Sequence, residues 1–380
     1  MVGLGEAFVY RCDGEKRFSD VKETYQRLVS DAAVEGPEVE PLAFTGFRFD
    51  PSTEVGAEWK DFGGGLLVLP QLLYARTARG RWVTENIVVQ PNGVGQTPIP
   101  KTGHQISALR RDERVTRAWW RDSVKGILDR IKQGELEKVV LARKVLQRCT
   151  RSISISKVLG RLMTSDPGCT VFAFSRGDAC FLGASPELLV RVSGDRVESV
   201  CLAGSAPRGT TPEEDRRLGA VLLQDVKELR EHSLVVREVA RVLGRLCLDL
   251  EWGDTPRLMK LGSVQHLATT FRGINGSRSH ILDFVRHLHP TAAVAGSPRR
   301  KALDVIRETE GMDRGWYAGP VGWIDGGGGG EFTVAIRSAL VRPEGAVLYS
   351  GAGIVEGSDS EKEYAETELK LSSLLDALRG

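Results

Sequence analysis

Residues 350–373 read SGAGIVEGSDSEKEYAETELKLSS and carry the strongest structural signal in the chain. They follow the apolar run 347–349, pass through Gly351 and Gly353, and then take on a helical pattern. Small residues let a ligand approach backbone N–H groups, and a helix N-terminus adds roughly half a positive charge. The segment therefore predicts a strand, an anion-binding glycine turn and a helix, in that order.

Two overlapping capping boxes bracket the start of this helix. Ser358 precedes Glu361, and Ser360 precedes Glu363, each pair with the spacing of a hydroxyl and a carboxylate that satisfy backbone N–H groups at a helix start. The sequence leaves both starting points open.

One stripe of the predicted helix is charged. Glu363, Glu366 and Lys370 recur at the helical period, which places them on one face. The apolar face is formed by Tyr364, Leu371, Leu375 and Leu378. Two exposed carboxylates three residues apart repel by roughly 0.2–0.5 kcal/mol. The stripe is therefore either a solvated surface or the wall of a cation site.

A second helical segment, KELREH at 227–232, repeats the arrangement with Glu228, Glu231 and His232. One divalent cation can explain both carboxylate pairs, because it would neutralise groups that otherwise repel. Oxygen ligands suit Mg²⁺, which takes one or two protein carboxylates together with water and an anionic substrate. No His/Cys cluster in the sequence suits zinc. Ion pairs with the many arginines are the alternative.

Composition limits the classes of function. The chain has 380 residues, of which 41% are hydrophobic and 27% charged, as in soluble globular proteins. Its 52 basic residues balance 50 acidic ones, which gives no support for nucleic acid or an anionic membrane as a partner. Six scattered cysteines without a CxxC pair, and no signal peptide, indicate a reducing cytoplasm. The longest apolar run, 66–75, is too short to span a bilayer.

The order of predicted elements favours an α/β (α+β) fold with large sheets. Residues 1–105 are expected to form a variable N-terminal sheet portion, with a helix at 21–33 and a loop at 90–103. Residues 115–380 contain longer strands and helices. Within this part we expect helices at 116–133, 211–246 and 299–308, a strand at 138–146, hairpins at 170–182 and 187–200, and a hairpin tip at 326–330. Long sheets with few long helices predict one domain with helices on the sheet faces.

Ten segments spread over residues 115–380 resemble, in one order, the chorismate-utilising enzymes, which include isochorismate, salicylate, anthranilate and aminodeoxychorismate synthases. The segments are KVVLARKV (138–145), ASPELLV (184–190), LAGSAPRG (202–209), KELREH (227–232), GSVQHLAT (262–269), HPTAAVAG (289–296), WYAGPVGW (316–323), VAIRSA (334–339), GAGIV (351–355) and EYAETELKLS (363–372). The resemblance implies a single aminodeoxychorismate-synthase-like domain over 1–380 and Mg²⁺-dependent chemistry on chorismate. It implies no glutaminase subunit, and we expect a monomer.

The motif variants imply which reaction is catalysed. Lys138 stands where members that add water at C2 carry a lysine, whereas amine-adding members carry glutamine, so Lys138 is implied to be the general base. That role needs a neutral amine, which burial or nearby positive charge favours. Lys144 shares the strand face of Lys138 and stays open as an alternative. Glu187 is implied to be the acid that protonates the departing C4 hydroxyl, a role that a dry pocket suits.

The resemblance also implies ligands for the metal and the substrate. Glu231 and Glu366 are the expected metal carboxylates, with Glu228 and Glu363 beside them. The expected substrate contacts are Gly204, Ser205, His266, Ala293, Tyr317, Arg337, Gly351, Gly353 and Lys370. Arg337 can pair a carboxylate through two parallel hydrogen bonds, which lysine cannot imitate. A core histidine with satisfied hydrogen bonds is the alternative for His266.

Two variants separate the chain from other members. Ala203 stands where aminodeoxychorismate synthases often carry a lysine that forms a covalent intermediate. Ala293, followed by Val294, stands where salicylate synthases resemble one another in having threonine. The resemblance therefore implies isochorismate synthase activity, feeding menaquinone or siderophore biosynthesis. Salicylate synthase is the nearest alternative, followed by an amine-adding synthase and a non-enzymatic chorismate-binding protein.

Overall fold

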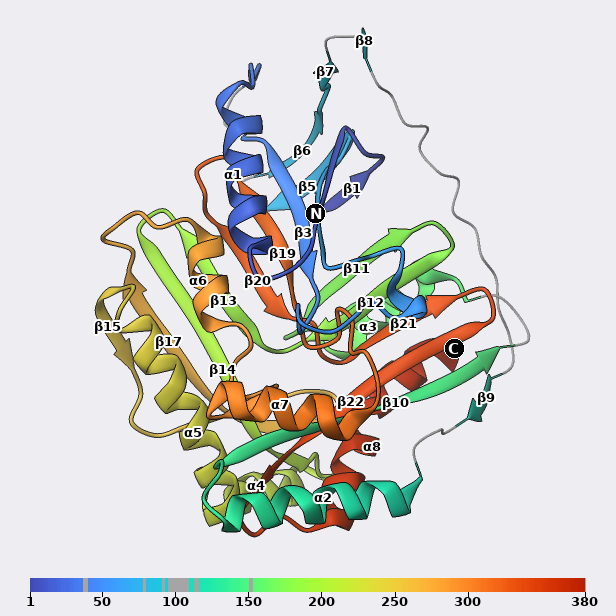
Figure 1. The fold of residues 1–380 in the computed structure, drawn as a ribbon, viewed down its shortest axis with the longest axis vertical. Coiled ribbons are helices and arrows are strands. Elements are labelled where there is room, and N and C mark those ends of the chain that lie inside the picture. The colour runs from blue at the N-terminus through green and yellow to red at the C-terminus, as the bar shows by residue number, and fades with distance from the viewer. Residues whose placement is uncertain are drawn as a thin grey trace.

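The computed structural model describes residues 1–36, 40–77, 80–90, 93–94, 109–112, 116–149 and 153–379. Within these residues two large antiparallel sheets dominate, one of ten strands and one of seven, and helices cover their outer faces (Figure 1). This is the mixed helix-and-sheet fold that the sequence predicts. Most of the loop expected at 90–103 lies outside the described residues.

The ten-stranded sheet joins the N-terminal part of the chain to the later part. Along the sheet its strands are β15 (Leu248–Trp252), β17 (Val264–Ile274), β14 (Arg196–Pro207), β13 (Leu188–Ser193), β20 (Gly330–Val334), β19 (Pro320–Asp325), β3 (Leu42–Phe47), β4 (Gly65–Leu69) and β2 (Phe8–Cys12), with β16 (Arg257–Lys260) also paired to β17. Because β3 pairs with β19, the first strands of the chain extend a sheet built mostly by residues after 188.

The seven-stranded sheet is organised around its two longest strands. Its strands are β11 (Thr170–Arg176), β12 (Ala179–Ser185), β21 (Ser338–Arg342), β22 (Gly345–Val355), β10 (Lys138–Cys149) and β18 (Gly296–Ser297), with β9 (Leu109–Asp112) also paired to β10. β10 and β22 pair without a break from Lys138 opposite Val355 to Arg148 opposite Gly345. Two smaller sheets contain β1 (Val2–Leu4), β5 (Leu72–Thr77) and β6 (Gly80–Glu85), and β7 (Val89–Gln90) and β8 (Gly93–Val94).

Helices pack on the sheets by their apolar faces. They are α1 (Arg17–Ser30), the short 3-10 helix η1 (Ala57–Trp59), α2 (Arg117–Lys132), α3 (Ile155–Ser165), α4 (Pro212–Leu222), α5 (Val226–Leu243), α6 (Ile281–Leu288), α7 (Arg299–Glu310) and α8 (Ser360–Arg379). α5 lies on β14 and β17, and α8 lies on β22 (Figure 1). The two helices that carry the predicted carboxylate pairs therefore rest on different sheets.

The main hydrophobic core contains residues from both large sheets. Phe47 and Phe332 come from the ten-stranded sheet, and Phe181 and Leu340 come from the seven-stranded one. A second core lies under α3 and α8 and includes Leu371, Leu375 and Leu378, as the predicted apolar face requires. The seven-stranded sheet is thus covered on both faces.

Three expectations about local structure are wrong. The helix expected at 211–246 is two helices, because the chain turns at residues 223–225 and the Asp225 side chain accepts a hydrogen bond from the Glu228 N–H to start α5. Gly351 and Gly353 lie inside β22 rather than in a turn before α8, so their backbone belongs to the pairing with β10. α8 begins at Ser360, and Asp359 rather than either expected serine accepts hydrogen bonds from its first N–H groups.

A buried ion pair completes the outer edge of β10. β18 pairs only with Lys138 and Val139, and β9 pairs only from Leu146 onward. Between them, Arg314 donates to the Val140 carbonyl at 2.8 Å, and Glu310 accepts from the Ala142 N–H at 2.7 Å. Their side chains are 3% and 1% exposed and bond to each other. This pair takes the place of a neighbouring strand at Val140 and Ala142, just beyond the residues that pair with β18.

Replacing Arg314 by leucine tests this interpretation. The Glu310 carboxylate would stay buried without its partner, and removing one member of a buried pair typically costs about 3–5 kcal/mol. We expect the free energy of unfolding in urea to fall by that amount. Arg300→Leu, at an exposed position of α7, the helix that carries Glu310, is the control and should change it by less than about 0.5 kcal/mol. A loss below about 1 kcal/mol for Arg314→Leu would contradict the assigned role.

Candidate active site

A pocket of about 630 Å³, counted with its open mouth, lies among β10, β14, β22 and the helices α5 and α8. Of the predicted site residues, those that line it are Glu187, Gly204, Ser205, Glu231, His266, Ala293, Tyr317, Arg337, Gly351, Gly353, Glu366 and Lys370. Lys138, Glu228 and Glu363 do not line it directly. The predicted residues that line the pocket therefore come from segments spread over 180 residues or more of the sequence.

Lys138 lies behind the pocket wall. Its side chain is fully buried, and its Nζ lies 2.9 Å from Oε1 of Glu231, which does line the pocket. Gly353 makes this approach possible: a Cβ at this position would lie 2.1 Å from Glu231 Oε1 and 2.9 Å from Lys138 Cε. Gly353, the second glycine of the GAGIV segment, is thus required for the close approach of Lys138 and Glu231 rather than for a turn.

Lys144, the alternative base, lies elsewhere. Its Nζ is 2.7 Å from Oε1 of Glu58, and it is not among the pocket residues. The two lysines share a strand face, as the period of two predicts, but Lys144 is six residues further along β10. Of these two, only Lys138 contacts a pocket residue through its ammonium group.

Glu187 is a buried acid held by its backbone. Its N–H donates to Ser185 Oγ, and its carbonyl accepts from the Val334 N–H and from Thr333 Oγ1. Burial raises the pKa of its carboxyl group to about 8, although Lys138 and Lys370 act to lower it. This carboxyl group is therefore protonated at neutral pH and can donate a proton into the pocket.

A chain of polar contacts crosses the pocket from Arg337 to Glu366. Arg337 Nη2 lies 3.0 Å from Nε2 of His266, and His266 Nδ1 lies 3.0 Å from Oγ of Ser205. Burial, and then Arg337 and Lys370, hold the pKa of His266 well below its ordinary value. A neutral ring that accepts from Arg337 carries its proton on Nδ1 and can donate it to Ser205, whose hydroxyl donates to Glu366.

Arg337 is the guanidinium most available to an anion. It is half-buried at the pocket, it donates to the Lys370 carbonyl, and among the described residues it has no carboxylate within ion-pair distance. Lys370 is ion-paired to Glu366 at 2.5 Å and donates to the Gly351 carbonyl at 3.0 Å. Arg337 thus leaves an uncompensated positive charge at the pocket wall, where a carboxylate would fit.

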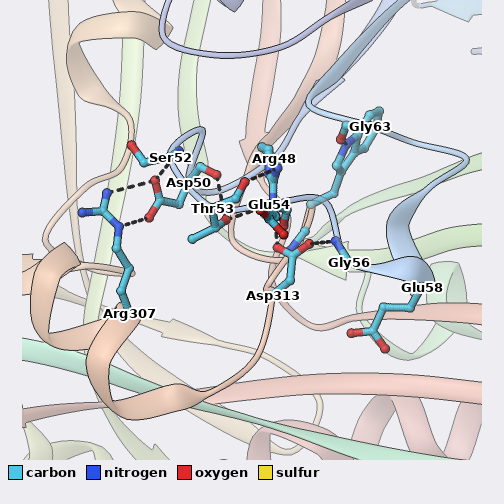
Figure 2. Close-up of polar contacts among 12 residues, drawn as sticks. Arg48, Asp50, Ser52, Thr53, Glu54, Gly56, Glu58, Gly63, Arg307 and Asp313 are labelled. Carbon is cyan, nitrogen blue, oxygen red and sulfur yellow. Dashed lines mark hydrogen bonds and ion pairs between the residues drawn. The ribbon is translucent and has the colours of Figure 1, made fainter.

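Two tyrosines form one wall, and the N-terminal part of the chain supports them. Tyr317 and Tyr349 stack with ring centroids 5.1 Å apart, and Trp59 packs against Tyr349. Figure 2 shows how the segment before Tyr317 is held: Asp313 accepts from Arg48 at 2.9 Å and from the Gly56 N–H at 2.8 Å. Residues 1–105, which carry none of the ten motifs quoted above, therefore shape the pocket indirectly.

The four predicted metal carboxylates come from α5 and α8 and lie near one another. The negative charges of Glu231 and Glu366, which line the pocket, act to raise the pKa values of Glu228 and Glu363. Burial, and then Glu366, raise the pKa of Glu363 to about 7, and burial and Glu231 raise the pKa of Glu228. As placed, no three acidic, histidine or cysteine groups of the described residues surround a single point as metal ligands would. Lysine ammonium groups lie between them instead.

Sequence reasoning missed several lining residues. They are Val140, Pro186, Leu202, Ile336, Tyr349 and Ser350. Val140, Pro186, Leu202 and Ile336 lie inside the quoted motifs, next to residues that were singled out, so the signal was present. Tyr349 precedes the GAGIV segment and reads as an ordinary apolar strand residue. Its place at the pocket follows from the register of β22, which the sequence does not specify.

Comparison with known proteins identifies the family. The family model described as "Chorismate binding enzyme" matches residues 1–379. The chain belongs to the chorismate-binding enzyme family. This confirms the resemblance inferred from the motifs, and it confirms that the chain is an enzyme.

Similar members of this family are isochorismate synthases. The chain is 38% identical to isochorismate synthase MenF of Bacillus subtilis in a match that covers 100% of this chain and 85% of that protein. It is 39% identical to the salicylate biosynthesis isochorismate synthase of Pseudomonas aeruginosa, over 96% of this chain and 80% of that one. The structure of MenF from Escherichia coli matches with a TM-score of 0.77 at 28% identity, covering 94% and 83% of the two chains.

A more distant structure shares the fold. Anthranilate synthase component I from Streptococcus pneumoniae matches with a TM-score of 0.74 at 20% identity, covering 93% of this chain and 84% of that one. In the described part of this chorismate-binding enzyme, no helix is both long and apolar enough to cross a membrane.

The raised pKa of Glu187 predicts a dependence of stability on pH. The carboxyl group ionises near pH 4.5 in the unfolded chain but near pH 8 in the folded one. The folded state therefore holds one more proton between these values, and its stability falls as the pH rises through this window. Glu187→Gln removes this loss. We expect its free energy of unfolding, relative to the unsubstituted protein, to increase steadily from pH 5 to pH 8.

Urea unfolding at each pH measures this difference. Glu135→Gln, at an exposed position, is the control and should show no such trend. A constant difference between Glu187→Gln and the unsubstituted protein over this range would show that Glu187 is ionised at neutral pH.

Proposed function

We propose that this enzyme is an isochorismate synthase that interconverts chorismate and isochorismate with Mg²⁺. The observation that carries the proposal is a pocket lined by a protonated acid, Glu187, and by Arg337, which has no carboxylate partner among the described residues, with the buried Lys138 behind the pocket wall. Full-length similarity to isochorismate synthases supports it.

Lys138 and Glu187 would carry the proton transfers. Lys138 removes a proton from the water that adds at C2 of chorismate, and Glu187 gives its proton to the hydroxyl that leaves C4 as water, while the ring double bonds shift. One water enters and one leaves, so the reaction is an isomerisation. Lys138 is ion-paired to Glu231 in this structure, so its ammonium group must first lose a proton before the neutral amine can accept one from water. Each positioned acid or base typically contributes about 10²–10⁴ in rate.

The carboxylates of the substrate would be bound by other residues that line the pocket. Arg337 supplies a guanidinium, Lys370 supplies an ammonium group, and Tyr317 supplies a hydroxyl. Any residue larger than glycine at position 351 would crowd this hydroxyl. Arg337 can bind a carboxylate by two hydrogen bonds, which fixes the orientation of the ring. Ala293 and Val294 offer only apolar contacts in the pocket, and neither has a hydroxyl that could act on the enolpyruvyl group of chorismate.

The residues that would hold Mg²⁺ are Glu231 and Glu366, with Glu228 and Glu363 next to them. The donor set fits this ion, because it consists of carboxylate oxygens, and Mg²⁺ needs only one or two of them beside water and substrate. When bound, the ion would supply positive charge that neutralises a substrate carboxylate.

We further propose that the enzyme acts in the cytoplasm as a monomer without a glutaminase subunit, and that isochorismate serves menaquinone or siderophore biosynthesis.

Product analysis tests the proposal. We expect purified protein mixed with chorismate and Mg²⁺ to form isochorismate, and to form much less when the metal is chelated. Formation of salicylate and pyruvate would favour the salicylate synthase alternative. Ammonia-dependent formation of anthranilate would favour an amine-adding synthase. No turnover of bound chorismate would indicate a binding protein.

Three variants test the assigned roles. Lys138→Ala and Glu187→Gln should each lower kcat by about 10²–10⁴, because each removes one proton-transfer group. Lys144→Ala, a lysine on the same strand face but paired to Glu58, is the matched control and should keep kcat within about threefold. Near-normal turnover in Lys138→Ala, or a large loss in Lys144→Ala, would overturn the choice of base.

A further inference from the structure

Lys227 places an ammonium group inside the carboxylate cluster formed by Glu228, Glu231, Glu363 and Glu366. This lysine lies in the first turn of α5. Its Nζ is 2.7 Å from Oε1 of Glu363, 2.9 Å from Oε1 of Glu228 and 3.9 Å from Oε2 of Glu231. One flexible side chain thus contacts three of the four carboxylates that the proposed function assigns to Mg²⁺.

The contact with Glu363 joins two helices. Lys370 pairs with Glu366 inside α8, and Lys138 joins β10 to Glu231 on α5. Among the described residues of this cluster, Lys227 is the cation that reaches from α5 to a carboxylate of α8. Glu363 is 3% exposed, so without a cation it would be a buried, uncompensated charge facing another helix.

We infer that Lys227 is a resident cation of the carboxylate cluster, which holds α5 and α8 together in the metal-free enzyme and weakens the binding of Mg²⁺. This inference rests on the metal site of the proposed function. Repulsion between like charges a few ångströms apart is large at the effective dielectric of a partly buried site. An ammonium group bonded to Glu228 and Glu363 therefore opposes the entry of a divalent cation beside Glu231 and Glu366.

The side chain of Lys227 has room to yield. It is 23% exposed, whereas Glu231 and Glu363 are 9% and 3% exposed. The lysine side chain has four methylene groups joined by rotatable bonds, so its ammonium group can turn toward solvent while the methylene groups nearest the backbone stay in place. The cluster then has two arrangements, one neutralised by Lys227 and one by the metal. Folding of the site does not depend on the metal, and its affinity for Mg²⁺ is lower than the carboxylates alone would give.

Calorimetric titration of metal-free protein with MgCl₂ measures the effect directly. Lys227→Met and Lys227→Gln both remove the charge, and the glutamine amide can still donate to the carboxylates if the methionine variant folds poorly. We expect each to bind Mg²⁺ at least about tenfold more tightly than the unsubstituted protein. Lys227→Arg keeps the charge, and Lys362→Met removes a charge at an exposed position of α8. Both controls should stay within about twofold.

Thermal unfolding gives a second readout. Without Mg²⁺, Lys227→Met and Lys227→Gln should melt at a lower temperature than the unsubstituted protein, and saturating MgCl₂ should narrow or close the gap. Equal or weaker Mg²⁺ binding by both variants would overturn the inference, as would equally tight binding by Lys227→Arg. If the unsubstituted protein binds no Mg²⁺ even with chorismate present, the metal site of the proposed function fails and this inference with it.

Discussion

The contact between Lys138 and Glu231 depends on a gap that a glycine leaves open. β10 delivers Lys138, α5 delivers Glu231, and β22 passes between them at Gly353, where even one methyl group would collide with both side chains. The unbroken pairing of β10 with β22 fixes this glycine opposite Val140, two residues from the lysine. A long antiparallel ladder thus sets the register of the site, because a slip of one residue would turn every side chain to the other face.

Burial alone does not decide which carboxyl groups in the pocket are ionised. Glu187 and Glu366 are both enclosed, and burial acts to raise the pKa of each. Glu366 nevertheless has a lowered pKa, because the adjacent Lys370 and the Ser205 hydroxyl favour its charged form. Among the described residues, no side chain hydrogen-bonds to the Glu187 carboxyl group, which therefore keeps its proton. Two glutamates in one cavity are therefore suited to opposite roles, one as an acid and one as an anion that attracts cations.

The motif-bearing part of the sequence brings most of the predicted site residues to one pocket. Gly353 must be glycine for steric reasons, because a larger residue would collide with Glu231 and Lys138. The helix boundaries were predicted less well: the break before Asp225 depends on one side-chain cap, and the end of β22 depends on its pairing with β10. The sequence also gave no sign that Lys227 fills the carboxylate cluster, since a lysine next to a glutamate is common on helices.

The supporting residues explain why the first hundred residues resist prediction. Arg48 and Asp313 are 265 positions apart, yet they bond to each other beside the pocket wall (Figure 2). Such contacts follow from the joining of β3 to β19, which places the early strands beside the segment that leads to Tyr317. A contact of this kind needs only some donor and some acceptor at the right place, so many residue pairs would serve. The chemistry constrains the pocket residues, whereas the support behind them is constrained only by packing and charge.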